Sequence, residues 1–255
     1  QAESSHIVLN AHKINAGELI TLDNKNKDFF FFEKKDVRSV MGALVYLVKT
    51  RLPEYIGASP FEIQVLTPMR KGELGVEHLN EVLQYYLNPA SESKKEKEGR
   101  TGVFREGDKV MQVKNNYKLE WKITNAKGFS IEEGLGVFNG DMGIIKQINT
   151  YSERITVVFD ENREAEYPFS SLDELELAYA ITIHKSQGSE YPAVVLPLLS
   201  GPPILCNRNL LYTAITRAQK CVAIAGRQSM VEQMIHNETE QKRYSGLNDC
   251  LKEGL

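Results

Sequence analysis

The sequence predicts an α/β fold in which helices flank a parallel sheet and a small antiparallel β-barrel is inserted. Short apolar runs such as "EIQVLTP" (62–68), "AVVLPL" (193–198) and "CVAIAG" (221–226) alternate with segments of helical periodicity. This alternation is typical of a parallel sheet. The middle of the chain has short alternating strands and turn signals instead. With 255 residues, 42% hydrophobic, the chain is long enough to bury a sizeable core.

The first part of the sequence predicts a helix, a strand and a second helix, in that order. In "SSHIVLNAHKINAG", the apolar residues Ile7, Val8, Ala11 and Ile14 form a helical stripe behind a serine cap. The run "FFFF" (29–32) predicts a buried strand, because a base-stacking role would require an exposure that strand packing disfavours. A second helix is expected behind Asp36, a natural N-cap.

The later α/β elements follow the same pattern. "EIQVLTP" predicts a strand that ends in a loop, and "GVEHLNEVLQYYL" predicts an amphipathic helix. The runs 193–198 and 221–226 predict two more buried strands, joined by a helix in "NRNLLYTAITRAQ". Ligands of such sheets bind beyond the carboxyl ends of the strands.

A charged run, "SESKKEKEGRTG" (91–102), lacks periodicity and predicts a mobile loop. The short strands that follow, from "DKVMQV" to "REAEYPF", predict the antiparallel barrel, inserted between the second and third recognisable strands. The expected division is therefore 1–102 with 176–255 as one discontinuous domain, and 103–175 as the barrel.

Composition narrows the class of protein. A net charge of −3 argues against a globally basic nucleic-acid binder, and no apolar run approaches the length of a membrane span. Cys206, Cys221 and Cys250 lie far apart, so we expect neither a disulfide framework nor a metal site, and a reducing cytoplasm fits best. The opening "QAESSHIVLN" lacks an initiator Met and a signal peptide, which we interpret as a cut through a longer polypeptide.

A local basic segment stands out against this charge. Between positions 109 and 127 there are five lysines against one acid, Glu120. Lys114, Tyr117, Lys118 and Trp121 are candidates for a single-strand path, because aromatic rings stack on bases and lysines follow phosphates. A mobile charged hairpin with one buried Trp explains the same residues equally well.

Two motifs carry the functional signal. The sequence contains no G-x-x-x-x-G-K-[ST] phosphate loop, but "YAITIHKSQGSEYP" and "NLLYTAITRAQKCVAIAG" follow one another closely. This pair resembles motifs V and VI of superfamily 1 helicases, and the spelling is most similar to the RecD-like, 5′-to-3′ branch, the exodeoxyribonuclease V alpha-chain type. "VLTPMRKGELGVEHLN" resembles a further motif of the family, and "FREGDKVMQVKNNY" with "VFNGDMGII" resembles its Src-homology-3-like barrel.

The resemblance implies the second RecA-like motor domain of an ATP-dependent DNA helicase of repair or recombination, with the barrel inserted. ATP and Mg²⁺ would be held mainly by a first motor domain that this sequence lacks, so the chain alone is expected to be inactive. Single-stranded DNA, that first domain and other recombination or repair proteins are the expected partners, in a cytoplasmic, nucleoid-associated setting without a membrane.

The resemblance places four residues on the nucleotide side of motifs V and VI. Arg217 would be the arginine finger that reaches the γ-phosphate, and its alternative is a surface Arg at a helix end. Glu190 would accept from ribose hydroxyls, and Gly188 would let the backbone approach phosphate, unless both form only a capped turn before a proline. Gln187 would couple the two ligands. Gln1 would end a further nucleotide-binding motif.

The same resemblance places five residues on the DNA side. Thr182 and His184 would contact phosphate oxygens, contacts that position a strand without reading its sequence. Lys185 would join them, although it equally fits a solvated surface charge. The alternative for His184 is a structural histidine whose hydrogen bonds are satisfied within the fold. Thr67 and Asn80 are weaker candidates, with a loop hydroxyl and a polar helix face as alternatives.

Two other functions remain open from the sequence. The chain could be a nucleic-acid or protein-docking module in which the barrel is the binding part. It could also be the second motor domain of a relaxase-linked or RNA-directed helicase of the same superfamily.

Overall fold

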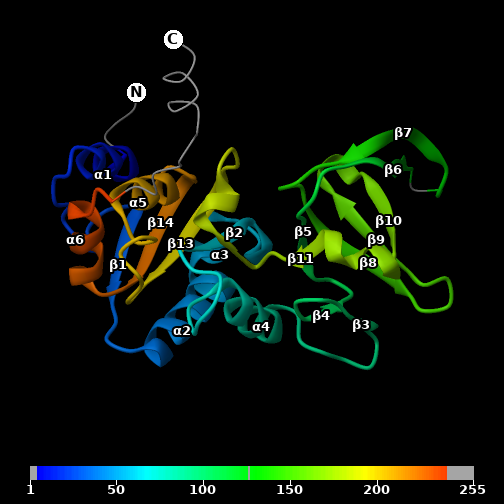
Figure 1. The fold of residues 1–255 in the computed structure, drawn as a ribbon, viewed down its shortest axis with the longest axis horizontal. Coiled ribbons are helices and arrows are strands. Elements are labelled where there is room, and N and C mark those ends of the chain that lie inside the picture. Colours follow the sequence, from blue (N-terminus) through cyan, green and yellow to red (C-terminus); the bar gives the residue numbers. More distant parts are fainter. Residues whose placement is uncertain (1–4, 126, 240–255) are drawn as a thin grey trace, which may run out of the picture.

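The computed structural model describes residues 5–125 and 127–239, which form two large sheets side by side and a two-stranded hairpin (Figure 1). One sheet is parallel and five-stranded, in the order β1-β14-β13-β2-β12. Its strands are β1 (Phe29–Glu33), β14 (Ala218–Gly226), β13 (Tyr191–Leu198), β2 (Ile63–Thr67) and β12 (Ala180–Thr182). The predicted parallel α/β fold is therefore confirmed, and β12 is a short edge strand that the sequence analysis did not separate from the polar run after it.

Helices cover both faces of this sheet, as its strand pattern requires. Alternate residues of one strand point to opposite faces: Val194 packs in the cluster with Ile14 of α1, and Val195 packs in the cluster with Leu44 of α2. The first face carries α1 (His6–Asn15), α5 (Arg208–Ile215) and α6 (Gln228–His236). The second carries α2 (Val37–Tyr46), a π-helix (Leu47–Arg51), α3 (Leu52–Ile56) and α4 (Val76–Leu87).

The predicted caps form at both early helices. The Ser5 side chain accepts from the amide of Val8 at the start of α1, and the Asp36 side chain accepts from the amide of Ser39 at the start of α2. In "FFFF", Phe29 and Phe31 are buried, whereas Phe30 and Phe32 are partly buried against the helices of the other face. The expected core role of this strand is confirmed.

The second sheet is antiparallel and seven-stranded, in the order β11-β5-β8-β9-β10-β6-β7. Its strands are β5 (Lys109–Gln112), β6 (Asn116–Thr124), β7 (Ser130–Val137), β8 (Met142–Asn149), β9 (Arg154–Phe159), β10 (Glu164–Pro168) and β11 (Leu175–Leu177). Short 3₁₀ helices lie at 60–62, 160–162, 169–174 and 183–186. All of this sheet lies between β2 and β12 in the sequence, as the predicted insertion requires.

The charged run 91–102 corrects one expectation. Instead of an irregular loop, it contributes β3 (Glu96–Glu98), which pairs with β4 (Val103–Arg105) in a two-stranded hairpin. Phe104 anchors the hairpin in the core at 2% exposure, and Arg105 Nε lies 2.6 Å from the Glu96 carboxylate. The sequence hid this hairpin because a single apolar anchor carries no periodicity.

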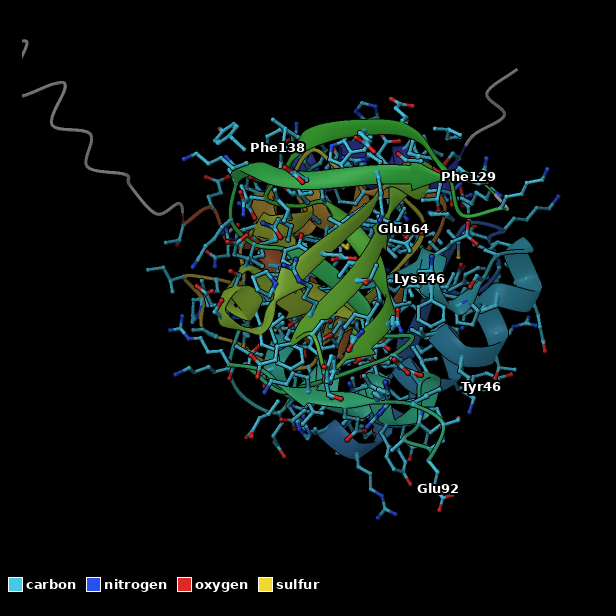
Figure 2. The ribbon with its side chains drawn as sticks, turned by 90° about the vertical axis from the view of Figure 1, so that its right-hand side faces the viewer. Tyr46, Glu92, Phe129, Phe138, Lys146 and Glu164 are labelled. Atoms are coloured by element: carbon cyan, nitrogen blue, oxygen red, sulfur yellow. The ribbon has the colours of Figure 1, made fainter. Side chains whose placement is uncertain are left out.

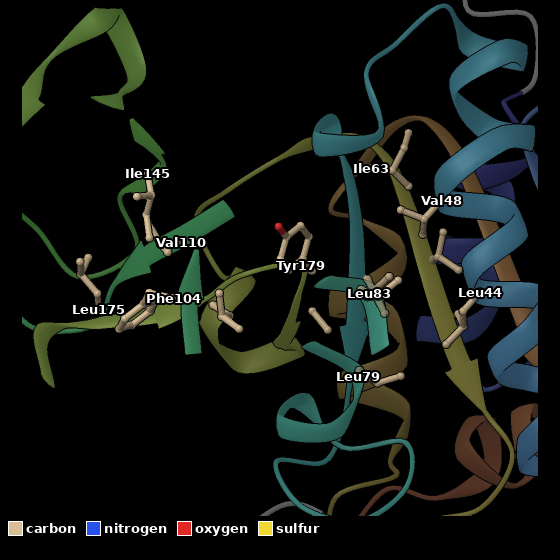
Figure 3. Packing of buried hydrophobic residues seen from close by; sticks show 14 of the residues in the cluster. Leu44, Val48, Ile63, Leu79, Leu83, Phe104, Val110, Ile145, Leu175 and Tyr179 are labelled. Carbon is tan, nitrogen blue, oxygen red and sulfur yellow. The ribbon is translucent and has the colours of Figure 1, made fainter. Parts of the chain in front are cut away.

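Buried contacts join the two sheets. One hydrophobic cluster runs from Leu44 and Ile63 beside the parallel sheet to Phe104 and Ile145 at the second sheet, with Tyr179 between them (Figure 3). Within the two described ranges, no helix combines the length and apolarity that a membrane span needs.

Candidate functional site

Arg217 and Glu190 meet at the amino-terminal edge of the parallel sheet. Each residue immediately precedes a strand, Glu190 before β13 and Arg217 before β14. These strands are neighbours, and their starts are tied by a hydrogen bond of 2.8 Å from the amide of Tyr191 to the carbonyl of Arg217. Residues 27 positions apart are thereby held at one place on the sheet edge.

The guanidinium of Arg217 is half-buried and forms no ion pair within the described residues. One terminal nitrogen donates to the carbonyl of Ser189 at 3.2 Å, and the other donates to the Thr216 hydroxyl at 3.4 Å. Its Nε is buried without a hydrogen-bond partner. A buried cationic donor without an anion is costly, so this arrangement fits an anionic ligand that arrives from outside the chain.

The neighbouring loop leaves room for such a ligand. Gly188 has a φ of +86° and nothing within 4 Å of the position that a Cβ would take, so the backbone there is open to close approach. Gln187 is exposed, and the exposed Glu190 carboxylate accepts from the side chain of Gln219 at 3.2 Å. The three residues belong to the connection to β13, in which Ser189 contacts Arg217.

Thr182 and His184 lie at the opposite edge of the same sheet. Thr182 ends β12 and pairs with Thr67, two residues beyond the Val65–Val195 pair of β2 and β13. At about 3.3 Å per residue, Thr182 is therefore about 20 Å along the strands from Tyr191. The eight residues 183–190 cross the face of the sheet that carries α5, with Ile183 buried there. Motif V thus connects the two sheet edges.

The residues predicted to contact DNA differ in their accessibility. His184 is exposed, and Thr182 caps the 3₁₀ helix Ile183–Ser186 by accepting from the amide of Lys185 at 3.4 Å. Lys185 is held by the carboxylate of Glu176 at 3.0 Å. Of these three side chains, His184 is the one that is immediately available to a ligand.

Thr67 and Asn80 are engaged inside the protein. The Thr67 hydroxyl donates to the carbonyl of Leu74 at 2.7 Å. Asn80 accepts from the amide of Ala180 at 2.8 Å and donates to the carbonyls of Leu177 and Ala180. Both side chains are at most 5% exposed, so contact with DNA would cost them these hydrogen bonds.

Two protein-family models match parts of this chain. Residues 79–159 match the model of the SH3 domain of ATP-dependent RecD-like DNA helicases, and residues 177–225 match the UvrD-like helicase C-terminal domain. The second match contains Thr182, Glu190 and Arg217. The chain carries the C-terminal domains of a RecD-like superfamily 1 helicase.

Similar proteins include the ATP-dependent RecD2 DNA helicase of Deinococcus radiodurans, 39% identical over 66% of this chain and 20% of that protein. The RecBCD enzyme subunit RecD of Mycolicibacterium smegmatis is 30% identical over 75% of this chain and 29% of that subunit. The chain thus spans less than a third of either relative. A solved Pif1 helicase from Bacteroides, in complex with ADP-AlF3 and single-stranded DNA, covers 99% of this chain and 55% of its own, at 18% identity and a TM-score of 0.49.

The lysine-rich segment of the RecD-like barrel forms the hairpin β6–β7, and its charges are mixed. Lys122 pairs across the sheet with Glu133 on one side and Glu164 on the other, and Lys114 forms an ion pair with Asp173. Glu164 also holds Lys146 on this face (Figure 2). The face is therefore not a continuous basic groove.

The aromatic residues of this hairpin have different environments. Tyr117 is 68% exposed and stacks edge-on against Phe138 at 5.5 Å, so its ring is accessible. Trp121 is half-buried, lies over Gly134 and has the Arg163 guanidinium 5.7 Å from its ring centroid. Lys118 is exposed beside them. Of the candidate single-strand path, Tyr117 and Lys118 remain the accessible members.

Gln1 lies outside the described residues. Within the ranges 5–125 and 127–239, no group of three or more His, Cys, Asp or Glu residues has metal-binding geometry.

Sequence reasoning missed the partners that hold the candidate residues in place. Ser189 and Gln219 lie next to motif residues and could have been proposed from their positions. Glu176, which holds Lys185, lies in a mostly acidic stretch in which nothing distinguishes one carboxylate from the others.

Proposed function

We propose that the chain is the second motor domain, with its inserted barrel, of an ATP-dependent 5′-to-3′ DNA helicase. The two sheets support a discontinuous motor domain, proposed at residues 1–102 with 176–255, around a barrel proposed at residues 103–175. β11 (Leu175–Leu177) carries the barrel sheet two residues past the second boundary, and the β3–β4 hairpin spans the first. The sequence has no phosphate loop, so the triphosphate and Mg²⁺ would be held by a first motor domain, the chain's principal partner. The setting would be the cytoplasm, close to the chromosome.

The observation that carries this proposal is the state of Arg217. A half-buried guanidinium with an unpartnered Nε and no ion pair to a described carboxylate fits a phosphate group. The open backbone at Gly188 fits the same chemistry. When ATP is bound between the motor domains, Arg217 would donate to its γ-phosphate and stabilise charge that develops during transfer, while Glu190 would accept from the ribose.

Coupling between bound ATP and the bound DNA strand would follow from the path of motif V. Residues 183–190 connect the strand-side Thr182 and His184 with the nucleotide-side Glu190 and the Arg217 contact through Ser189. A displacement at the nucleotide edge is therefore transmitted through one short segment to the DNA edge. The two ligands bias the same element, which is the requirement for allosteric coupling.

The test is Arg217→Ala in the intact helicase, with Arg227→Ala as the control. Arg227 lies at the other end of β14, where it donates to the carbonyl of Lys35 at 2.6 Å. We expect Arg217→Ala to lower DNA-stimulated ATP hydrolysis by about 10³-fold with strand affinity nearly unchanged, and Arg227→Ala to leave the rate within about threefold. An unchanged rate for Arg217→Ala would remove the arginine finger from the proposal.

The docking-module alternative receives less support. Its barrel face carries Glu120, Glu133, Glu164 and Glu166 among Lys118, Lys122 and Arg154, so its charge does not favour a polyanion.

A further inference from the structure

One carboxylate, Glu176, lies between two cations that come from distant parts of the chain. Its Oε1 lies 2.6 Å from a terminal nitrogen of Arg70, and its Oε2 lies 3.0 Å from Nζ of Lys185. Arg70 follows β2 in the loop before α4, Lys185 belongs to the 3₁₀ helix after β12, and Glu176 belongs to β11 of the barrel sheet. Each oxygen of the carboxylate therefore has one cationic donor.

The carboxylate is less exposed than either of the two cations. The side chain of Glu176 is 18% exposed, against 29% for Lys185 and 44% for Arg70. Burial alone would raise the pKa of Glu176, but the hydrogen bonds from Arg70 and Lys185 outweigh it and hold this pKa below its usual value. Glu176 is therefore ionised at neutral pH, and a new anion would have to displace it.

Arg70, Glu176 and Lys185 lie at the carboxyl-terminal edge of the parallel sheet. β2 and β12 end there side by side, at Thr67 and Thr182, and ligands of such sheets bind beyond this edge. The backbone amide of Lys185 donates to the Thr182 hydroxyl, and the exposed His184 lies between these two residues in the chain. Arg70 and Lys185 thus lie on the edge where the proposed function puts the strand.

A carboxylate and a phosphodiester offer the same pattern of acceptors. Each presents two oxygens that share one negative charge, and each is bound well by an arginine fork together with a lysine ammonium. A phosphate of a bound strand would satisfy both cations as Glu176 does, without the constraint that β11 places on Glu176.

We propose that Arg70 and Lys185 form a subsite for a backbone phosphate of single-stranded nucleic acid, and that the Glu176 carboxylate occupies this subsite until the strand displaces it. The inference rests on the proposed function, to which it adds Arg70 as a strand contact and Glu176 as an internal competitor. Because Glu176 lies on β11, which pairs with β5, strand binding would also release a contact between the barrel and motif V.

The test is fluorescence anisotropy of a labelled oligothymidylate titrated with the chain at several salt concentrations. Glu176→Gln removes the competing charge, so we expect binding to become about threefold to tenfold tighter. Its control is Glu96→Gln, which makes the same charge change in a carboxylate that also lies 2.6 Å from an arginine, Arg105, but on the β3–β4 hairpin. Since unfolding cannot tighten binding, a gain for Glu176→Gln alone would support the proposal directly.

Arg70→Ala tests the proposed contact between Arg70 and the phosphate. We expect weaker binding and a slope of log affinity against log salt that falls by about 0.7, the value for one phosphate contact on a single strand. Glu176→Gln binding no tighter than Glu96→Gln, or an unchanged slope for Arg70→Ala, would overturn the subsite.

Inorganic phosphate distinguishes a strand from a free ion as the ligand. It should compete weakly with the strand for the native chain and less for Arg70→Ala. If Arg70→Ala loses this competition but keeps full strand affinity, the site binds free phosphate and the proposal is wrong. If all variants bind the strand equally, only this inference fails, whereas absence of strand binding by the native chain would count against the proposed function as well.

Discussion

At the scale of single residues, Asp108 and Lys109 are the unusual pair, because both are buried at the start of β5 and neither forms an ion pair with a described residue. Asp108 accepts from the side chains of Gln84, Asn88 and Tyr179 and from the amide of Arg105, at 2.6 to 2.8 Å. Lys109 donates to the Phe61 carbonyl and to Gln64 at 2.7 and 2.8 Å. These contacts join the barrel sheet to the motor sheet.

Asp108→Asn should destabilise the protein although it removes a buried charge. Each carboxylate oxygen accepts from two donors, so the new amide NH₂ would face two donors at one of the positions. We expect a loss of about 2 kcal/mol in the free energy of unfolding, measured by urea denaturation. Asp160→Asn, on an exposed 3₁₀ turn, is the control and should change stability little. Equal stability of the two variants would show that the four hydrogen bonds contribute nothing net.

Lys109 should make stability depend on pH in the alkaline range. Burial lowers the pKa of Lys109 to about 7, so above this value the unfolded chain binds a proton that the folded protein does not. Stability therefore falls as the pH drops from the ordinary lysine pKa toward about 7, and the effect is constant below that.

The matching experiment compares native protein and Lys109→Met. Between about pH 9.5 and pH 7.5 we expect the native protein to lose about 2 kcal/mol more than the variant in urea unfolding. Parallel pH dependence of the two proteins would contradict the neutral, buried state of Lys109.

At the scale of elements, the segment from β12 to β13 determines the geometry of the site. The motif resemblance identified its residues and implied a nucleotide side and a DNA side, with Gln187 coupling the two ligands. It did not show that β12 ends level with Thr67, and so it did not show that the two halves of motif V lie at opposite sheet edges. Register between distant strands leaves no local signal in the sequence.

Gly188→Ala tests the nucleotide half of this segment. At a φ of +86° any side chain is strained, so we expect a loss of about 1 kcal/mol in stability together with a clear fall in ATP turnover by the intact helicase. Gly140→Ala is the matched control, because Gly140 has a φ of +103° and equally open space, but lies in the turn before β8 of the barrel. Equal turnover of the two variants would remove Gly188 from the nucleotide site.

Other elements show what pattern can and cannot predict. The helix stripe of Ile7, Ala11 and Ile14 was predictable because burial of one helix face imposes periodicity. The runs of β2 and β13 were predictable because strands buried on both faces are apolar almost throughout. The β3–β4 hairpin was not, since only Phe104 is buried in it. For Thr67 and Asn80, polar character alone could not distinguish a ligand contact from hydrogen bonds within the fold.

At the scale of the whole molecule, the proposed function makes the chain half of a two-part site. The parallel sheet presents Arg217 and Gly188 at one edge and His184 at the other, and the barrel is fixed to this sheet through Tyr179, Asp108 and Lys109. Composition, alternation and the two motifs predicted the parallel sheet with its inserted barrel, but not the placement of these residues at opposite edges. The electrostatic partners of the site residues, Glu176 above all, required the structure, because tertiary folding alone brings them together.

The measurement that tests this account most directly is DNA-stimulated ATP hydrolysis by the purified 255-residue chain, beside the intact helicase in the same assay. Binding of single-stranded DNA to the chain, measured by fluorescence anisotropy, verifies that the chain is folded and competent to bind. The account predicts binding without turnover above background, because the chain supplies Arg217 but no phosphate loop. Robust, DNA-stimulated hydrolysis by the chain alone would contradict it.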